Sequence, residues 1–195
     1  MYVQACHLFL QGEGSNLIRN LLATIGTYVN KENNRKPYIE EIHAIGLIVD
    51  ADTGNPSDLA RKYADELQLT FPMISGVPGT ITVGTPRTGI YVLPDNKRQG
   101  TLDSILVDCA ANVYSDHKVG AEAFLNDLDD KHKKHWRKPF GGQKALVASI
   151  VSVLEPGMAN TSSIAQDNWI GEETVKRVAE IASLRDFLAN LLELV

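Results

Sequence analysis

Residues 45–52 have the sequence Ile45-Gly46-Leu47-Ile48-Val49-Asp50-Ala51-Asp52. The apolar part of this stretch is short and rich in β-branched residues, which predicts a buried strand rather than a helix. The strand ends on two aspartates spaced i and i+2, and in an extended backbone this spacing points both carboxylates the same way. Open α/β sheets bind ligands at the carboxyl ends of their strands, and carboxylates suit Mg²⁺ or Mn²⁺. We therefore predict a divalent-metal site at Asp50 and Asp52.

The polar run after this strand predicts the start of a helix. Residues 53–56 (Thr-Gly-Asn-Pro) break the strand, and Ser57 is predicted to cap a helix over 58–67. The alternative to a metal site is that one aspartate caps this helix while the other is solvated.

A second strand and helix follow a similar pattern further along the chain. Residues 87–94 predict a strand, preceded by a short one at 80–83, and Asp95-Asn96 lies at its carboxyl end. Thr101 is predicted to cap the next helix, which leaves Asp103 in the first turn. The helix dipole favours a carboxylate there, and this effect by itself accounts for an acid at that position.

The N-terminal residues are similar in part to a dinucleotide-binding start. Residues 5–11 predict a strand, Gly12-Glu13-Gly14 ends it, and Ser15 is predicted to cap a helix. Strand, Gly-x-Gly turn and helix open many dinucleotide-binding folds. Leu17 occupies the position of the third glycine of that pattern, so we do not expect a nucleotide cofactor.

A charged stretch marks the C-terminal half. Residues 121–138 change from acidic to basic, which favours a solvated helix, with a phosphate-facing basic end as the alternative. His132 and His135 are spaced i and i+3, but no Glu stands between them, and the surrounding lysines would repel a cation.

Two apolar helices are predicted after this stretch. Gly141-Gly142 is expected to break the chain before a helix over 144–154. A closing helix over 172–194 has a single apolar stripe. Core packing is favoured for this stripe over the seam of a homodimer.

The composition is that of an ordinary globular protein. The 195 residues predict one domain over 1–195, with its core at about 1–115 and a helical extension at about 116–195. The net charge of −5 argues against nonspecific coating of nucleic acid, but it leaves a nuclease open because a bound metal supplies positive charge. Without a membrane-spanning run or a signal peptide, we expect a cytoplasmic protein. Cys6 and Cys109 are predicted to be buried thiols.

Three motifs in this order, at 46–52, 89–96 and 100–103, resemble a family of uncharacterised small proteins with a TOPRIM-type fold. That family has Asp-Ala-Asp at the central strand, Pro-Asp-Asn after the next strand and Gly-x-Leu-Glu at the opening of the following helix. Segments 144–157 and 164–166 are also similar to its tail, so the resemblance covers nearly the whole chain. The group is in turn similar to the nuclease half of the overcoming-lysogenization-defect (OLD) proteins.

The resemblance implies an α/β fold with a parallel sheet of about four strands sandwiched by helices. TOPRIM domains bind Mg²⁺ through their paired acids and a first-strand glutamate, and they cut, join or transfer phosphodiesters of DNA or RNA. By that analogy Asp50 and Asp52 are metal ligands, and Asp103 is a further ligand in place of the family's glutamate. Lys144 would be a cation that contacts the scissile phosphate.

The candidate for the first-strand glutamate, which serves as general acid–base or ligand, is Glu13. The turn around Glu13 is more similar to the family's second-strand turn, because one helix leads directly from it to the central strand. On that alignment the strand with the glutamate precedes Met1. A missing or degenerate first motif is thus slightly favoured over a working Glu13.

Two classes of function follow from these predictions. The first is a Mg²⁺- or Mn²⁺-dependent nuclease or phosphodiesterase that acts on DNA or RNA. The second is a non-catalytic module that keeps the TOPRIM scaffold and binds a nucleic acid, a nucleotide or a protein partner. Glu13 close to the three aspartates would favour the enzyme, and Glu13 in solvent far from them would favour the module.

Overall fold

A computed structural model of the chain describes residues 8–10, 43–69, 71–136, 138–166 and 169–194. A small sheet with the strand order β1-β2-β4-β3 lies at its centre. The strands are β1 (Leu8–Leu10), β2 (Ala44–Asp50), β3 (Ile81–Thr82) and β4 (Arg87–Leu93). β1, β2 and β4 run parallel, whereas β3 pairs antiparallel with β4. The α/β class is confirmed, and the sheet is mixed because β3 runs against the others.

The strand predictions agree closely with the structure. β4 and the short β3 lie within the predicted ranges 87–94 and 80–83. β2 begins one residue before the predicted strand and ends at Asp50 rather than Asp52. β1 is the described part of the strand predicted at 5–11.

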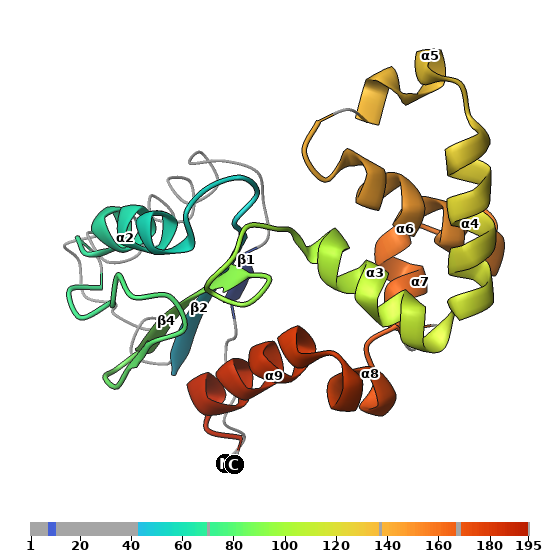
Figure 1. Cartoon of the computed structure of the whole chain (residues 1–195). Helices are drawn as coiled ribbons and strands as arrows, with labels where there is room; N and C mark the ends of the chain where they lie inside the picture. Colours follow the sequence, from blue (N-terminus) through green and yellow to red (C-terminus); the bar gives the residue numbers. More distant parts are fainter. Residues whose placement is uncertain (1–7, 11–42, 70, 137, 167–168, 195) are drawn as a thin grey trace.

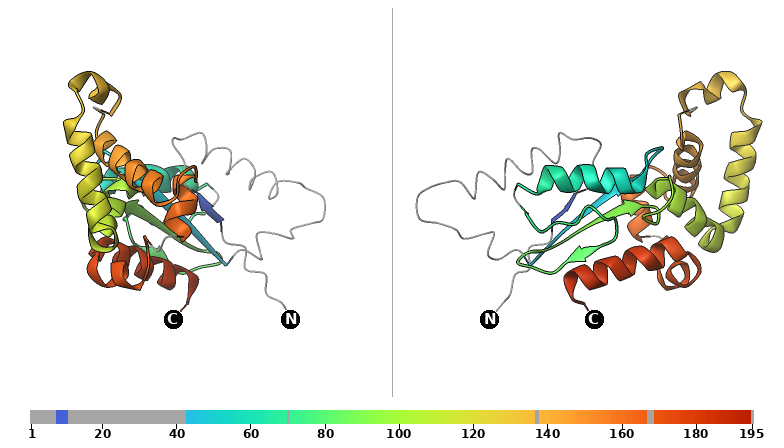
Figure 2. Two further views of the ribbon diagram at one scale, coloured as in Figure 1. Left: turned by 90° about the vertical axis from the view of Figure 1, so that its right-hand side faces the viewer. Right: turned by 60° about the vertical axis from the view of Figure 1, so that its left-hand side comes forward.

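Helices cover both faces of the sheet, α2 (Pro56–Leu67) on one and α9 (Ala179–Leu192) on the other, as Figures 1 and 2 show. The side chains of β2 and β4 alternate between two apolar clusters. The cluster on the α2 side includes Ile45, Leu47, Ile90, Val92, Ala60, Ala64 and Leu67. The cluster on the α9 side includes Ala44, Tyr91, Leu93, Ile181, Phe187 and Leu191. The apolar stripe of the closing segment is therefore core, as favoured.

Two glycines that are partners across the sheet let α9 approach closely. Gly46 of β2 pairs with Gly89 of β4. A Cβ atom on Gly46 would lie 2.7 Å from the Leu191 side chain, and one on Gly89 would lie 2.9 Å from the Phe187 ring. Any larger residue would push α9 away from the sheet, which explains glycine within two otherwise apolar strands.

α3 (Leu102–Val113) joins the sheet to a second group of helices. Ile105 and Cys109 contact the α9-side cluster, and Leu106 and Ala110 face a third cluster that contains the fully buried Trp169. The other helices that the structure describes are α4 (Ser115–Asp127), α5 (Asp130–Lys133), the 3-10 turn η1 (Lys134–Trp136), α6 (Gly141–Leu154), α7 (Asn160–Gln166) and α8 (Glu172–Arg177). Figure 1 shows that α4 and α6 lie side by side beyond α3.

Three helix boundaries differ from the predictions. Asn55, not Ser57, caps α2: its side chain accepts the N–H groups of Ser57 at 2.9 Å and Asp58 at 3.3 Å, and Pro56 fits the first turn. Gly141 opens α6 instead of breaking the chain. Thr101 does cap α3, as predicted.

Two predicted helices are interrupted. The helix expected over 121–138 ends at Asp127 because Leu128 is extended, and α5 and η1 follow it. The closing helix is divided into α8 and α9 by Val178, whose ψ of 103° is not helical.

Two further observations bear on environment. Cys109 is a free, fully buried thiol, as predicted, and burial raises its pKa to about 12; Cys6 lies outside the described residues. Of the helices that the structure describes, none is both long enough and apolar enough to cross a membrane.

Candidate functional site

Asp50 lies at the carboxyl end of β2, half-buried, and is bound to the start of α3. Its Oδ1 accepts the backbone N–H of Leu102 at 2.8 Å. Burial is the largest influence and raises the pKa of Asp50, the hydrogen bond from Leu102 lowers it, and the charges of Asp52 and Asp103 raise it. The net result is a pKa above the ordinary value of 3.8. Asp50 is therefore a carboxylate whose negative charge lacks full compensation.

Asp52 occupies a different environment from Asp50. Its φ of +47° is in the left-handed region, so the strand alternation behind the predicted carboxylate pair ends at Asp50. The backbone of Asp52 instead exchanges two hydrogen bonds with Gly100, and its side chain is exposed. The two acids remain close enough for the charge of Asp52 to raise the pKa of Asp50. They form an electrostatic pair with one half-buried and one solvated member.

Asp103 and Lys144 complete this group from two helices. Asp103 is in the first turn of α3 and Lys144 is in the first turn of α6. Burial raises the pKa of Asp103, and the charge of Lys144 partly opposes the increase. Lys144 also lowers the pKa of Asp50. The structure therefore brings together the predicted Asp50, Asp52, Asp103 and Lys144, which come from three separate segments.

A side-chain hydrogen bond holds the starts of α3 and α6 together. Ser104 Oγ donates to Gln143 Oε1 at 2.8 Å, and the same hydroxyl accepts the backbone N–H of Thr101 at 3.2 Å. Gln143 directly precedes Lys144. This contact fixes the backbone that carries the lysine beside the acids.

The donor set suits a hard divalent cation in its chemistry, but it is not a compact cage. Carboxylates are preferred ligands of Mg²⁺, which is commonly held by one or two protein carboxylates together with substrate phosphates. Among the residues that the structure describes, no three His, Cys, Asp or Glu side chains are grouped closely enough to hold a metal by themselves. An ion held by these acids would need further ligands, such as water or a phosphate.

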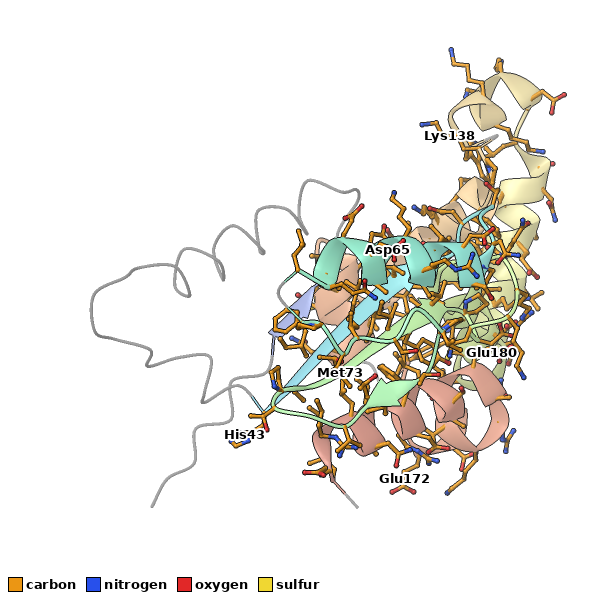
Figure 3. The ribbon with its side chains drawn as sticks, turned by 90° about the vertical axis from the view of Figure 1, so that its left-hand side faces the viewer. His43, Asp65, Met73, Lys138, Glu172 and Glu180 are labelled. Carbon is orange, nitrogen blue, oxygen red and sulfur yellow. The ribbon has the colours of Figure 1, made fainter. Side chains whose placement is uncertain are left out.

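A pocket of about 620 Å³ opens beside this group. Asp52 and Thr53 line one side of it, and residues of the connection into α6 line the other. The lining residues of that connection and of α6 are Trp136, Lys138, Pro139, Gly141, Lys144 and Ala145. Figure 3 shows Lys138 above the end of the sheet. Of these, sequence reasoning singled out Lys144 alone, and the only signal for Trp136 and Lys138 was the basic end of 121–138.

Asp95 and Asn96 have structural roles. Asp95 Oδ1 accepts the backbone N–H groups of Lys97 at 3.0 Å and Arg98 at 2.9 Å. Asn96, with φ of +67°, accepts the backbone N–H of Val92 at 2.7 Å. The Pro-Asp-Asn motif therefore forms the turn that ends β4. Arg98 then pairs with both Asp95 and Glu180, which ties this turn to α9.

Glu13 lies outside the described residues. The register of β1 with β2 sets Leu10 opposite Leu47. In sequence, Glu13 follows Leu10 by three residues and Asp50 follows Leu47 by three residues.

The chain was also compared with known proteins. No curated protein and no solved structure matches it. The profile of a family described as "Protein of unknown function (DUF3226)" matches residues 9–193, from β1 to the residue after α9. The chain therefore belongs to the DUF3226 family.

Proposed function

We propose that this protein is a TOPRIM-like enzyme that cleaves phosphodiesters of DNA or RNA with the help of Mg²⁺ or Mn²⁺. The main support is the half-buried carboxylate of Asp50 at the carboxyl end of a parallel strand, with the charges of Asp52, Asp103 and Lys144 all within electrostatic reach. Parallel α/β sheets bind their ligands at this edge.

The electrostatics of the group favour a cation. Burial and like charge both disfavour the ionised form of Asp50, so a positive ion beside it would relieve an existing repulsion. Asp50 Oδ1 accepts one hydrogen bond, from the Leu102 N–H, so the carboxylate keeps further lone pairs that could hold an ion. We assign Asp50 and Asp52 as metal ligands and Asp103 as the third acid.

The chemistry follows from these assignments. A bound divalent ion would neutralise charge on the phosphate and lower the pKa of a water molecule. Lys144, exposed in the first turn of α6, would contact the scissile phosphate from the opposite side of the pocket. Glu13 is the candidate general acid–base that the resemblance implies, and the Glu13→Gln variant tests that role.

A non-catalytic TOPRIM module that binds nucleic acid, nucleotide or protein is the second candidate. The observation in its favour is that the described residues contain no compact three-ligand group and that Asp52 is exposed. Such a module would bind its partner without turnover.

The test is cleavage of plasmid, single-stranded DNA and RNA in Mg²⁺ or Mn²⁺ by the wild type and by Asp50→Asn, Asp52→Asn and Glu13→Gln. The Asp50→Asn variant keeps an oxygen that accepts the Leu102 N–H, so its fold is maintained. We expect each variant to lose cleavage by about a hundredfold or more. Asp65→Asn, which changes an exposed acid on α2, is the matched control and should cleave like the wild type.

Mn²⁺ titration followed by electron paramagnetic resonance gives a readout independent of activity. Asp50→Asn should weaken Mn²⁺ binding, and Asp65→Asn should not. Absence of cleavage of every substrate by folded wild-type protein would contradict the enzyme and leave the binding module. Cleavage that survives Asp50→Asn and Asp52→Asn would contradict the assigned site.

A further inference from the structure

Described residues from the end of η1 to the first turns of α6 line the pocket together with Asp52, and we call them the wall. The wall contributes one aromatic side chain, Trp136, and two exposed lysines, Lys138 and Lys144. The pocket of about 620 Å³ is within the size range of small-ligand sites and is large enough for a nucleotide. Its lining thus combines an aromatic residue, two lysines and an aspartate.

The position of Trp136 is fixed by the backbone around it. Its indole N–H donates to the carbonyl oxygen of His132 at 2.9 Å. A Cβ atom on Gly141 would lie 2.3 Å from the Trp136 carbonyl oxygen, so the connection can fold back onto α6 only with glycine at its start. Phe140, with φ of +62°, makes the turn between them. Because the indole N–H is already used, Trp136 would offer a ligand its ring rather than a hydrogen-bond donor.

The two lysines, Lys138 and Lys144, are exposed and make no ion pair with another described residue. By contrast, Lys131 pairs with Asp129, and Lys133 donates to the Asn126 carbonyl oxygen at 3.0 Å. Lys144 also influences Asp50 and Asp103. In a chain of net charge −5, two exposed lysines without a hydrogen-bonded acid partner among the described residues favour a phosphate at this place.

We propose that Trp136 and Lys138, together with Lys144, bind an unpaired nucleic-acid strand, with a base stacked on Trp136 and the adjoining phosphates on the two lysines. Stacking on an indole needs a base whose face is free, which a duplex does not offer. The wall would thereby select single strands and carry the next phosphodiester to Asp50 and Asp52. The role of the wall in delivering a strand for cleavage rests on the proposed function. Binding of the strand itself needs no metal.

The test is binding of fluorescein-labelled single-stranded oligonucleotides, a DNA and an RNA 20-mer, measured by fluorescence anisotropy in EDTA so that no cleavage occurs. We expect Trp136→Ala to raise the Kd about tenfold, as for the loss of one base–aromatic stack, and Trp136→Phe to restore most of the affinity. Lys138→Gln combined with Lys144→Gln should lower the slope of log Kd against log salt by about 1.4.

Lys176→Gln on α8 is the matched charge control and should bind like the wild type. A duplex of the same sequence and a mononucleotide serve as competitors, and both should compete more weakly than the single strand. Wild-type affinity in folded Trp136→Ala and in the double lysine variant would overturn the proposal, as would equal binding of duplex and single strand.

The two proposals fail in different ways. Wall-dependent binding in EDTA without any cleavage in Mg²⁺ would overturn the hydrolase and leave the single-strand site. Cleavage that depends on Asp50 but is unchanged in Trp136→Ala and Lys138→Gln would overturn the single-strand site and leave the hydrolase. No binding of any oligonucleotide by the wild type would overturn the single-strand site.

Discussion

Asp52 and Gly100 exchange two backbone hydrogen bonds, from Asp52 N to Gly100 O at 2.8 Å and from Gly100 N to Asp52 O at 3.0 Å. This bridge fastens the exit of β2 to the loop before α3. It lies directly beside the bond from the Leu102 N–H to Asp50, so the acid end of the strand and the start of the helix form one unit. The site is therefore positioned by backbone as much as by side chains.

We expect Asp50→Asn to be more stable than the wild type at pH 7 without metal. The raised pKa means that ionised Asp50 disfavours the folded state at neutral pH, and the variant removes the charge while keeping an acceptor for Leu102. The difference should shrink as pH falls through the raised pKa and vanish below 3.8, where the carboxyl is protonated in both states. Thermal unfolding followed by circular dichroism from pH 7 down to pH values below 3.8 measures this.

Asp50→Ala is the companion to that experiment. It leaves the Leu102 N–H without its partner and should be less stable than Asp50→Asn by about 1–3 kcal/mol. Equal stability of Asp50→Ala and Asp50→Asn would show that the hydrogen bond from Leu102 contributes nothing to stability. If Asp50→Asn were less stable than the wild type at pH 7, the ionised carboxylate of Asp50 would not be destabilising.

Gly89→Ala should cost more stability than Gly46→Ala. The new methyl group at Gly89 would meet the rigid Phe187 ring at 2.9 Å and the Thr80 carbonyl oxygen at 3.3 Å, whereas Gly46 faces only the end of the flexible Leu191 side chain. We expect a loss of about 1–3 kcal/mol at Gly89, measured by urea unfolding.

Gly120→Ala is the control for glycine substitution. It lies in α4 with no atom near its hypothetical Cβ, and it should instead gain about 0.5–1 kcal/mol from helix propensity. A Gly89→Ala protein as stable as the wild type would mean that α9 can move away from the sheet at no cost.

Asp95→Asn should lower stability at neutral pH and have no effect in acid. Burial raises the pKa of Asp95, but hydrogen bonds from the backbone of Arg98 and Lys97 and from the Arg98 side chain outweigh burial and hold the pKa below 3.8. The ionised carboxylate therefore stabilises the fold above pH 3.8, and the contribution is lost as pH falls through the depressed pKa. We expect about 0.5–1 kcal/mol at pH 7, reduced by salt because Arg98 is exposed.

The Asp95 effect has a simple control in Asp65→Asn. Asp65 is exposed on α2 and forms no ion pair with another described residue, so its variant should follow the wild type from acid to neutral pH. A constant difference between Asp95→Asn and the wild type over that range would rule out ionisation as its cause.

Ser104 and Gln143 should be energetically coupled. Their hydrogen bond of 2.8 Å joins the starts of α3 and α6. A double-mutant cycle with Ser104→Ala and Gln143→Ala, followed by urea unfolding, should give a coupling energy of about 0.5–1.5 kcal/mol. Strictly additive single effects would show that the two helices are held by their apolar contacts alone.

The sheet and the helices packed on it could be predicted because the sequence patterns that indicate them are local. Continuous apolar runs predicted β2 and β4, and the stripe of the closing segment predicted a core-facing helix. The first residues of the helices depended on weaker local interactions. Asn55 took the cap in place of Ser57 because Pro56 fits the first helical position, and Gly141 entered α6 because a close approach to Trp136 requires glycine.

The site could be predicted only in part, because its contacts span long stretches of chain. The acid at Asp50 was visible, but its partner Leu102 is 52 residues away. The left-handed backbone of Asp52 depends on its bridge to Gly100, and no local pattern predicts that bridge. Trp136 and Lys138 line the pocket from the segment that follows α4 and includes α5 and η1, and charge periodicity does not reveal the break at Leu128 that starts this segment.

The placement of the two tryptophans has a practical consequence. Trp169 is fully buried among apolar side chains, and its ring centroid is 5.5 Å from that of Tyr114, whereas Trp136 lines an open pocket. With Trp136→Phe, the remaining emission reports melting of the helical cluster. With Trp169→Phe, the emission of Trp136 reports whether a ligand is bound in the pocket beside Asp52. The chain thus contains two separable intrinsic fluorophores: Trp169 for unfolding of the helical cluster, and Trp136 for ligand binding in the pocket.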